Sequence, residues 1–208
     1  MTQPRPRAGQ PAITSRGKVW RKTLLPKIHH QGKLLSLVLV PVLLAACSDS
    51  EEATYTVPET VCGVRIDPDA LRPLLRPGDT LETENISRDP VPGECRILTD
   101  SRQNIWMEPW PLGEVKDPVE WARYRGHREA QETSLPGVAE GGAVWPRGAL
   151  TSFRCHEEEQ PDDSHALTPE INLSLEESIE DEEERMRRLE DLLASYVEGL
   201  RELYECEV

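Results

Sequence analysis

The feature that most constrains this chain is an apolar run, residues 34–46, that ends abruptly at Cys47. Eight Lys and Arg residues and no Asp or Glu precede Cys47, and the run closes on the small residues Ala45 and Ala46. A basic segment, a short apolar core and small residues before a cleavage point are typical of a secretory signal peptide. A helix of this length reaches roughly 20 Å, short of the ~30 Å that a membrane span must cross. We therefore expect residues 1–46 to be a removed leader.

The four residues at this point, LAAC (44–47), resemble the lipobox of bacterial lipoproteins. In that family the cysteine thiol receives a diacylglycerol and the leader is then cut off just before the cysteine, which implies that Cys47 starts the mature protein. Two acyl chains anchor a protein stably, at about 0.8 kcal/mol per buried methylene. The resemblance implies a lipoprotein on the outer face of the cell membrane, held there through Cys47. The alternative is an ordinary signal peptide with an incidental cysteine, and the export route stays open because Arg21-Lys22 is not a twin-arginine pair.

The part after the leader is strongly acidic. Of the 24 Lys and Arg residues eight lie in the leader, so 16 remain against all 38 Asp and Glu residues, a net charge of −22 with His neutral. Such a surface repels phosphodiester backbones and anionic lipids. Nucleic-acid binding and direct adhesion to the membrane are therefore not expected, and the lipid is left as the anchor.

Cysteines after Cys47 are even in number, which in an exported chain predicts two disulfides. They are Cys62, Cys95, Cys155 and Cys206. No two have CxxC spacing, so a zinc site or a thioredoxin-type motif has no support. Of the three pairings, we favour Cys62–Cys95 with Cys155–Cys206, because each closes a loop between neighbouring elements, but the other two remain open.

The hydrophobic pattern predicts an α+β fold, with an antiparallel sheet packed by helices and a long C-terminal amphipathic helix. Residues 47–60 are polar and acidic and are expected to be a flexible tether; residues 61–208 then form one domain. Two further helices are predicted, a short one that Asp67 caps before Pro68 and one from Asp117-Pro118 with Trp121 and Tyr124 facing inward. Strands are predicted over 94–100, 104–110, 149–155 and 170–176. A turn-rich connection is expected over 135–148 and a surface loop over 156–169.

Within the second of these strands, Pro109 and Pro111 are expected to mark a sheet edge or the strand's end. The fourth, with Ile171, Leu173 and Leu175 alternating, is expected to be half buried.

The C-terminal helix, expected between Ser178 and Cys206, has the clearest pattern, because apolar residues recur at gaps of three and four. They are Met186, Leu189, Leu193, Tyr196, Leu200 and Leu203. The acidic run Glu180–Glu184 is expected in the first turn, where the helix dipole favours carboxylates, and Ser178 with Asp181 resembles a capping box. No glycine-turned ligand loop accompanies this run, and His156 and His165 match no zinc spacing, so no metal site is predicted.

Two groups of residues form a candidate ligand patch. Trp106 and Trp110 share one face of their predicted strand and suit either a sugar-stacking platform or the core of a chain with one Phe. Arg123, Arg125 and Arg128 are the densest basic cluster of an acidic domain. They suit either an anionic ligand or internal pairing with the acidic C-terminal helix.

Catalytic motifs such as GxSxG, HExxH, SxxK or a phosphate-binding glycine loop do not occur, so no catalytic residue and no cofactor are predicted. We expect a monomeric, lipid-anchored binding or accessory/sensor domain whose partner is an envelope protein or a small ligand. One alternative is a cell-envelope hydrolase with a dispersed site. Another is a solute-capturing lipoprotein, for which a mature chain of ~160 residues is short.

Three stretches, residues 61–79, 141–155 and 193–206, resemble parts of small actinobacterial, especially streptomycete, lipoproteins of unknown function. A looser similarity extends to the DUF3558-type lipoproteins, in which an early cysteine is followed by a short helix. These motifs are structural, so the resemblance implies no functional residue. The run Glu180–Glu184 and the acidic loop over 156–169 depart from the pattern.

Overall fold

The computed structural model describes residues 53–88, 91–138, 140–155, 166–174 and 179–206. The chain divides into two units, Met1–Cys47 and Ser48–Val208, and all described residues belong to the second. Cys47, Ser178, and His156 and His165 lie outside the described residues, as does Leu175. No helix in the described ranges is long and apolar enough to cross a membrane.

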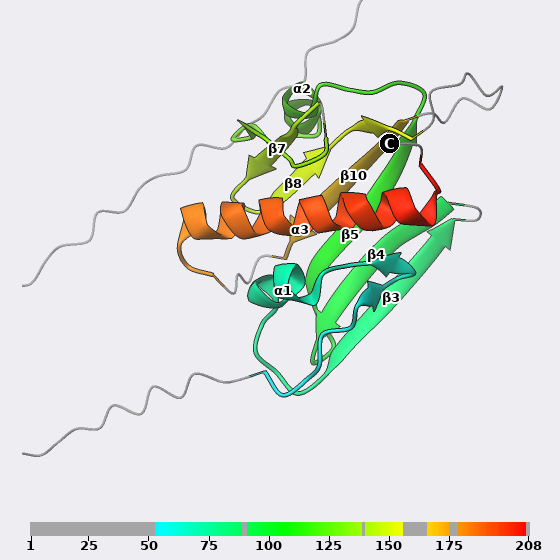
Figure 1. Ribbon diagram of the computed structural model, residues 1–208. Coiled ribbons are helices and arrows are strands. Elements are labelled where there is room, and N and C mark those ends of the chain that lie inside the picture. Colours follow the sequence, from blue (N-terminus) through cyan, green and yellow to red (C-terminus); the bar gives the residue numbers. More distant parts are fainter. Residues whose placement is uncertain (1–52, 89–90, 139, 156–165, 175–178, 207–208) are drawn as a thin grey trace, which may run out of the picture. The chain divides into compact units, whose positions relative to one another are not determined.

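One antiparallel sheet of eight strands forms the centre of the domain (Figure 1). Its strands are β3 (Leu81–Arg88), β4 (Val91–Thr99), β5 (Arg102–Leu112), β6 (Gln131–Thr133), β7 (Gly142–Trp145), β8 (Gly148–Thr151), β9 (Phe153–Arg154) and β10 (Ala166–Leu173). They lie in the order β3-β4-β5-β10-β8-β7-β6, with β9 also paired to β10. β10, the last strand in sequence, thus joins the two halves of the sheet.

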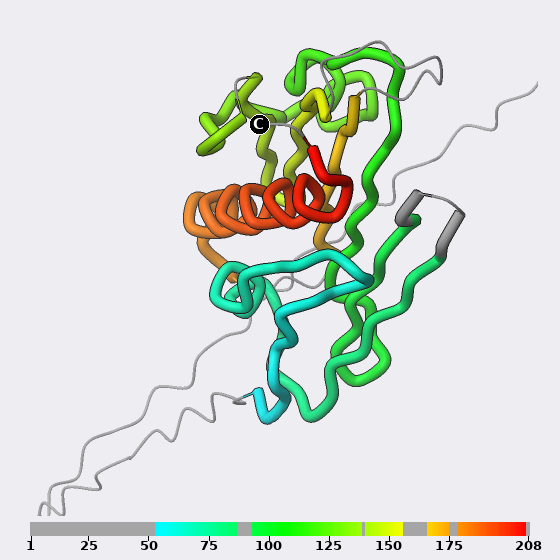
Figure 2. Tube along the Cα trace, turned by 45° about the vertical axis from the view of Figure 1, so that its right-hand side comes forward, coloured from blue at the N-terminus to red at the C-terminus, as the bar shows by residue number. Residues whose placement is uncertain are grey.

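Two helices lie on opposite faces of this sheet. The long helix α3 (Glu182–Leu203) crosses one face, beside the short helices α1 (Pro68–Leu71) and η1 (Arg72–Leu74) and the hairpin β1 (Thr60–Val61) and β2 (Val64–Arg65) (Figures 1 and 2). The helix α2 (Pro118–Tyr124) packs its Ala122 against Ala143 and Leu150, whereas the next residues, Val144 and Ala149, belong to the α3 side. Because side chains alternate along strands, neighbouring residues of β7 and β8 point to opposite faces of the sheet. We call the face that packs against α3 the α3 face and the face that packs against α2 the α2 face. The predicted α+β fold with a long C-terminal helix is confirmed.

The α3 face carries the main core. The buried residues Leu189, Leu193, Tyr196 and Leu200 follow the predicted stripe, whereas Leu203 is exposed. The helix begins later than predicted, because Asp181 rather than Ser178 is the N-cap and accepts a hydrogen bond from the Glu184 N–H at 2.8 Å.

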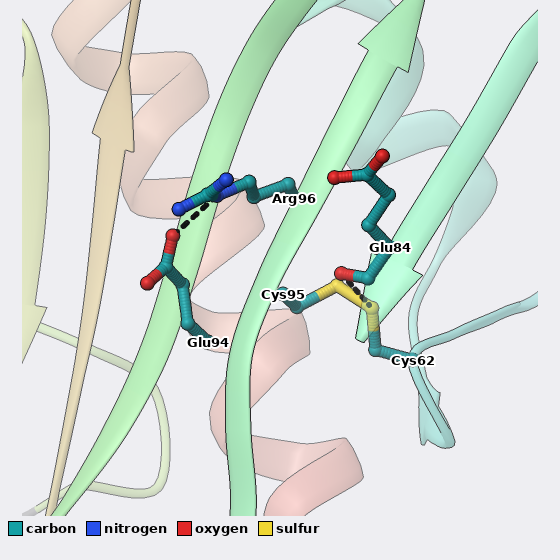
Figure 3. The surroundings of a disulfide bond; sticks show 5 residues. All are labelled: Cys62, Glu84, Glu94, Cys95 and Arg96. Carbon is teal, nitrogen blue, oxygen red and sulfur yellow. Dashed lines mark hydrogen bonds and ion pairs between the residues drawn. A yellow bond between two sulfur atoms is a disulfide. The ribbon is translucent and has the colours of Figure 1, made fainter. Parts of the chain in front are cut away.

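Both disulfides have the favoured pairing, Cys62–Cys95 and Cys155–Cys206. The first ties the β1–β2 hairpin to β4, with the Arg96–Glu94 ion pair beside it (Figure 3). The second ties the segment after β9 to the segment after α3. The first bond therefore fastens the hairpin to the main sheet, and the second fastens the C-terminal end of α3 to it.

Several expectations for the strands were wrong. The strand does not end at its prolines, because β5 runs on to Leu112. Its described ladder to β4 ends at Met107, so Pro109 and Pro111 lie where β5 has one free edge, in agreement with the other alternative. The turn-rich connection contains β7, which is buried. The last strand begins at Ala166, inside the predicted loop, and is buried rather than half buried, since it is the central strand of the sheet.

Two further expectations concern single side chains. Tyr124, expected to face inward, is 79% exposed, because α2 ends at this residue and buries Pro118 and Ala122 instead. The segment expected to be a tether contributes Val57 to the core, and the Tyr55 hydroxyl donates to the Arg76 carbonyl at 2.5 Å. The packed domain therefore starts before residue 61.

Candidate functional site

The candidate site lies on the α2 face, where β5 and β10 run side by side. Their side chains on this face stand opposite one another in register, as the pairs Trp106–Asn172, Glu108–Glu170 and Trp110–Thr168. Ile105 and Met107 are fully buried in the core on the other face, in agreement with the predicted alternation along β5. A polar and aromatic strip therefore lies on the back of an apolar core.

Glu170 is the centre of this strip, with a side chain that is only 1% exposed. Its Oε2 accepts from Arg125 Nη2 at 3.3 Å, and its Oε1 accepts from the side-chain amide of Asn172 at 2.9 Å and lies 3.3 Å from His127 Nε2. A buried carboxylate without such partners would be very costly. Here both of its oxygens are engaged.

These partners decide the protonation state of Glu170. Burial, the largest influence, acts to raise the pKa of the carboxyl group. Hydrogen bonds from His127 and Asn172 and the positive charge of Arg125 act against it, and together they lower the pKa below its ordinary value. Glu170 is therefore ionised at neutral pH and holds Arg125 and His127 in place.

Aromatic rings support both of these basic side chains. The guanidinium of Arg125 lies 4.6 Å from the ring centre of Trp110, and the imidazole of His127 stacks on Trp145 at 4.1 Å with an interplanar angle of 13°. A guanidinium over an indole gains a further cation–π attraction. Arg125 and His127 are thus fixed from two sides, by the carboxylate and by an aromatic ring.

The sequence of α2 explains how they reach the sheet. Asp117 caps the helix by accepting from the Glu120 N–H at 2.7 Å, and Pro118 starts its first turn, as predicted. The helix ends at Tyr124, and Gly126 at φ +104° reverses the chain. Glycine adopts this backbone conformation readily, and the resulting reversal brings His127 back toward the sheet.

The structure brings only part of the candidate patch together. Trp110 and Arg125 are in contact, whereas Trp106 lies between Arg96 and Asn172 in the neighbouring strands. Arg123 donates to the Ala130 carbonyl at 3.3 Å, and Arg128 is exposed. The patch residues therefore continue from the strip onto the outer surface of α2.

The predicted pairing of this basic cluster with the acidic helix is not found among the described residues. α2 and α3 lie on opposite faces of the sheet, and Arg125 pairs with Glu170 of β10 instead. The acidic start of α3 pairs with arginines of the same helix, as in Glu184–Arg188 at 2.8 Å and Glu184–Arg187 at 2.7 Å.

Little free ring surface is left on the tryptophans for a sugar to stack on. Arg125 occupies a face of Trp110, His127 a face of Trp145, and Tyr124 a face of Trp121 at 5.2 Å. Three of the rings are thus already partnered within the domain.

Sequence reasoning missed Glu170 and Asn172. Both stand at alternate positions of "EINLSLE", a polar series that was expected to face solvent. Alternation showed that Glu170 and Asn172 share one face of their strand, but not that this face is buried. The burial follows from the central place of β10 in the sheet.

This arrangement does not favour acid–base catalysis by Glu170, because a substrate would have to displace the hydrogen-bond partners of its carboxylate. The site can instead present the cationic Arg125 at the surface beside the imidazole of His127, since these side chains are 29% and 26% exposed. In the described parts of the chain, no three His, Cys, Asp or Glu side chains are grouped so as to hold a metal ion.

A hollow of about 970 Å³ lies elsewhere, over the outer side of α3 between α1 and Pro136-Gly137. The facing charges Arg65 and Glu202 pair with each other at 3.6 Å, and Arg201 donates to the Gly137 carbonyl at 2.7 Å. No described side chain of the Glu170 cluster lines it.

Fold and site together define a disulfide-bonded α+β domain with a buried carboxylate that orders an exposed basic surface. No family model, no curated protein and no solved structure matches this chain. Its function is therefore inferred from the geometry of the site.

Proposed function

We propose that this chain is a lipid-anchored extracytoplasmic domain that binds a partner and does not transform it. The supporting observation is the pairing of the cysteines. The four that follow Cys47 form two disulfides, as is usual in an oxidising compartment. Cys47 is then the odd cysteine of the chain, and it stands at the lipobox-like LAAC, which suits acylation.

Binding is favoured over hydrolysis by the state of Glu170. Each carboxylate oxygen already has a partner, and the lowered pKa keeps the group ionised. A general acid needs a proton near neutral pH, and a general base or nucleophile needs an accessible oxygen. A fixed basic surface on a mature chain of net charge −22 instead suits recognition of an anionic partner.

The position of this surface supports the same role. The described chain starts at Ala53, at the end of the domain opposite to α2 in both views (Figures 1 and 2). An anchor that precedes Ala53 would hold that end toward the membrane. α2 would then face away from the lipid and toward other envelope components.

Metabolic labelling with an alkyne analogue of palmitate tests the anchor in bacterial cells that express the full chain. We expect label on the wild type and none on Cys47→Ala, and Ser48→Ala is the matched control that should keep it. An unlabelled wild-type product released into the medium would contradict the anchor, as would an uncleaved leader on a chain with four reduced thiols.

A further inference from the structure

The surface at the end of α2 combines features that protein interfaces use most. We call Arg123, Tyr124, Arg125, His127 and Arg128 the α2-end patch. Tyr124 is the most exposed large apolar residue of the described chain, at 79%, while Ile86 and Leu203 are at 40% and 44%. Tyr and Arg, with Trp beneath them, are the residues that dominate binding energy at interfaces.

Order in the patch is built into the domain. The Tyr124 ring stacks on Trp121 with an interplanar angle of 22°, and Arg125 is held by Glu170 and Trp110. Side chains fixed before binding lose less conformational entropy when a partner arrives. The exposed Tyr124 and the neighbouring Arg125 are therefore already ordered before a partner binds.

We infer that the α2-end patch is a docking surface for an acidic segment of another protein, an inference that rests on the proposed binding function and names its partner class. Three of the 16 basic residues after the leader fall within residues 123–128. A basic patch on a mature chain of net charge −22 attracts an acidic partner locally, while the rest of the chain repels a misplaced one.

A macromolecule fits this surface better than a small ligand. Small-ligand sites are concave, and three hollows in the domain lie over α3, beside α1 and at the start of α2. Arg123 lines the third hollow, beside carboxylates such as Glu120 and Glu132. The other four residues of the patch line none of the three. A lipid surface is disfavoured because α2 lies at the end opposite to the start of the described chain (Figure 1).

Fluorescence anisotropy with labelled poly-L-glutamate as the acidic probe tests the inference on the purified full chain as cells process it. We expect Tyr124→Ala and Arg128→Glu each to weaken binding about tenfold. Leu203→Ala and Arg72→Glu are the matched controls, because they change an exposed apolar side chain and an exposed arginine outside the patch. Both should leave the affinity unchanged.

Equal affinity in all five proteins would overturn the inference. So would tighter, patch-dependent binding of poly(glycerol phosphate) or of phosphatidylglycerol vesicles, which would assign the patch to a wall polymer or a membrane. Concentration-dependent self-association that Tyr124→Ala abolishes would also overturn it, because the partner would then be a second copy.

A photo-crosslinking amino acid on intact cells tests the same surface in place. At position 129, an exposed residue next to Arg128, it should give a discrete protein adduct that Arg128→Glu removes, and at position 203 it should give none. Adducts of equal yield at both positions would overturn the inference. The wild-type chain separates the two proposals. Patch-dependent probe binding by a wild type that takes no palmitate label would sink the anchor alone, and a labelled wild type without such binding would sink the docking surface alone.

Discussion

The two faces of the sheet are built by different chemistry. Apolar side chains of α3 such as Leu189, Leu193 and Leu200 seal one face with no exposed surface. On the other face the buried groups include Glu170 and Thr168, each with polar partners. Apolar burial supplies stability without direction, whereas a hydrogen-bonded carboxylate fixes the orientation of what it binds. The α3 face thus holds the domain together, and the α2 face orders a surface.

The largest expected effect on stability comes from adding a methyl group where α3 approaches the backbone of β2. A Cβ at Gly199 would lie 2.0 Å from the Arg65 carbonyl oxygen, so the helix would have to move. We expect Gly199→Ala to exceed the usual ~1–3 kcal/mol of an overpacked site and to cost on the order of 5 kcal/mol. Urea denaturation measures it. Glu198→Ala on the exposed side of α3 is the control, and similar losses in both variants would refute the close approach.

Removal of the disulfides ranks next. They close segments of 33 and 51 residues, and each is expected to contribute about 4 kcal/mol by restricting the unfolded chain. We expect Cys155→Ser with Cys206→Ser to lower the free energy of unfolding by that amount and to release the end of α3 first. Hydrogen exchange reports where the protection is lost. Uniform loss over the whole sheet would speak against a local clamp.

A change on the α2 face is expected to cost somewhat less. Glu170→Gln removes the buried negative charge that Arg125 and His127 share, and breaking such a pair costs roughly 3 kcal/mol. Glu129→Gln, in an exposed carboxylate of the same region, should cost almost nothing. If the two variants are equally stable at pH 7, the cluster does not order the α2-end patch.

Acidification should remove part of the same contribution. The folded pKa of Glu170 lies below its ordinary value, so its stabilisation is fully present above the unfolded pKa of about 4.3. The stabilisation is lost as the pH falls through the folded pKa. The stability gap between wild type and Glu170→Gln should therefore shrink in urea titrations below about pH 4. A gap that grows in acid would mean that the carboxyl is protonated when buried.

The smallest expected effect is that of Tyr124→Ala. With its ring 79% exposed, the change should alter the free energy of unfolding by less than ~0.5 kcal/mol. Thermal unfolding measures it, and Tyr196→Ala, in a fully packed tyrosine of the α3 face, should cost several kcal/mol. A large loss at Tyr124 would make this side chain structural and would leave the patch without its central contact.

Local rules predicted much of the α3 face. Asp67 caps α1 as expected, the stripe from Leu189 to Leu200 is buried, and both disulfides pair as favoured. These features depend on residues that are near in sequence or on neighbouring elements, so periodicity and capping reveal them.

The α2 face depended on pairing between distant residues. Glu170 meets Arg125 and His127 only because β10 enters between β5 and β8, and no local pattern encodes that register. The same insertion buries both sides of β10 and gives its polar residues partners. The face of Trp106 and Trp110 was predictable from alternation, but the Arg125 guanidinium over Trp110 was not.

The late position of β10 in the sequence also determines when the domain can form. Until Ala166 has emerged, β3–β5 and β6–β8 are two half-sheets with one open edge each at the place that β10 will fill. Open edges invite pairing with other chains, and contacts between remote residues form slowly. A chain that stops before Ala166 should therefore aggregate, and a complete one has to be kept apart from its neighbours until its final quarter is in place.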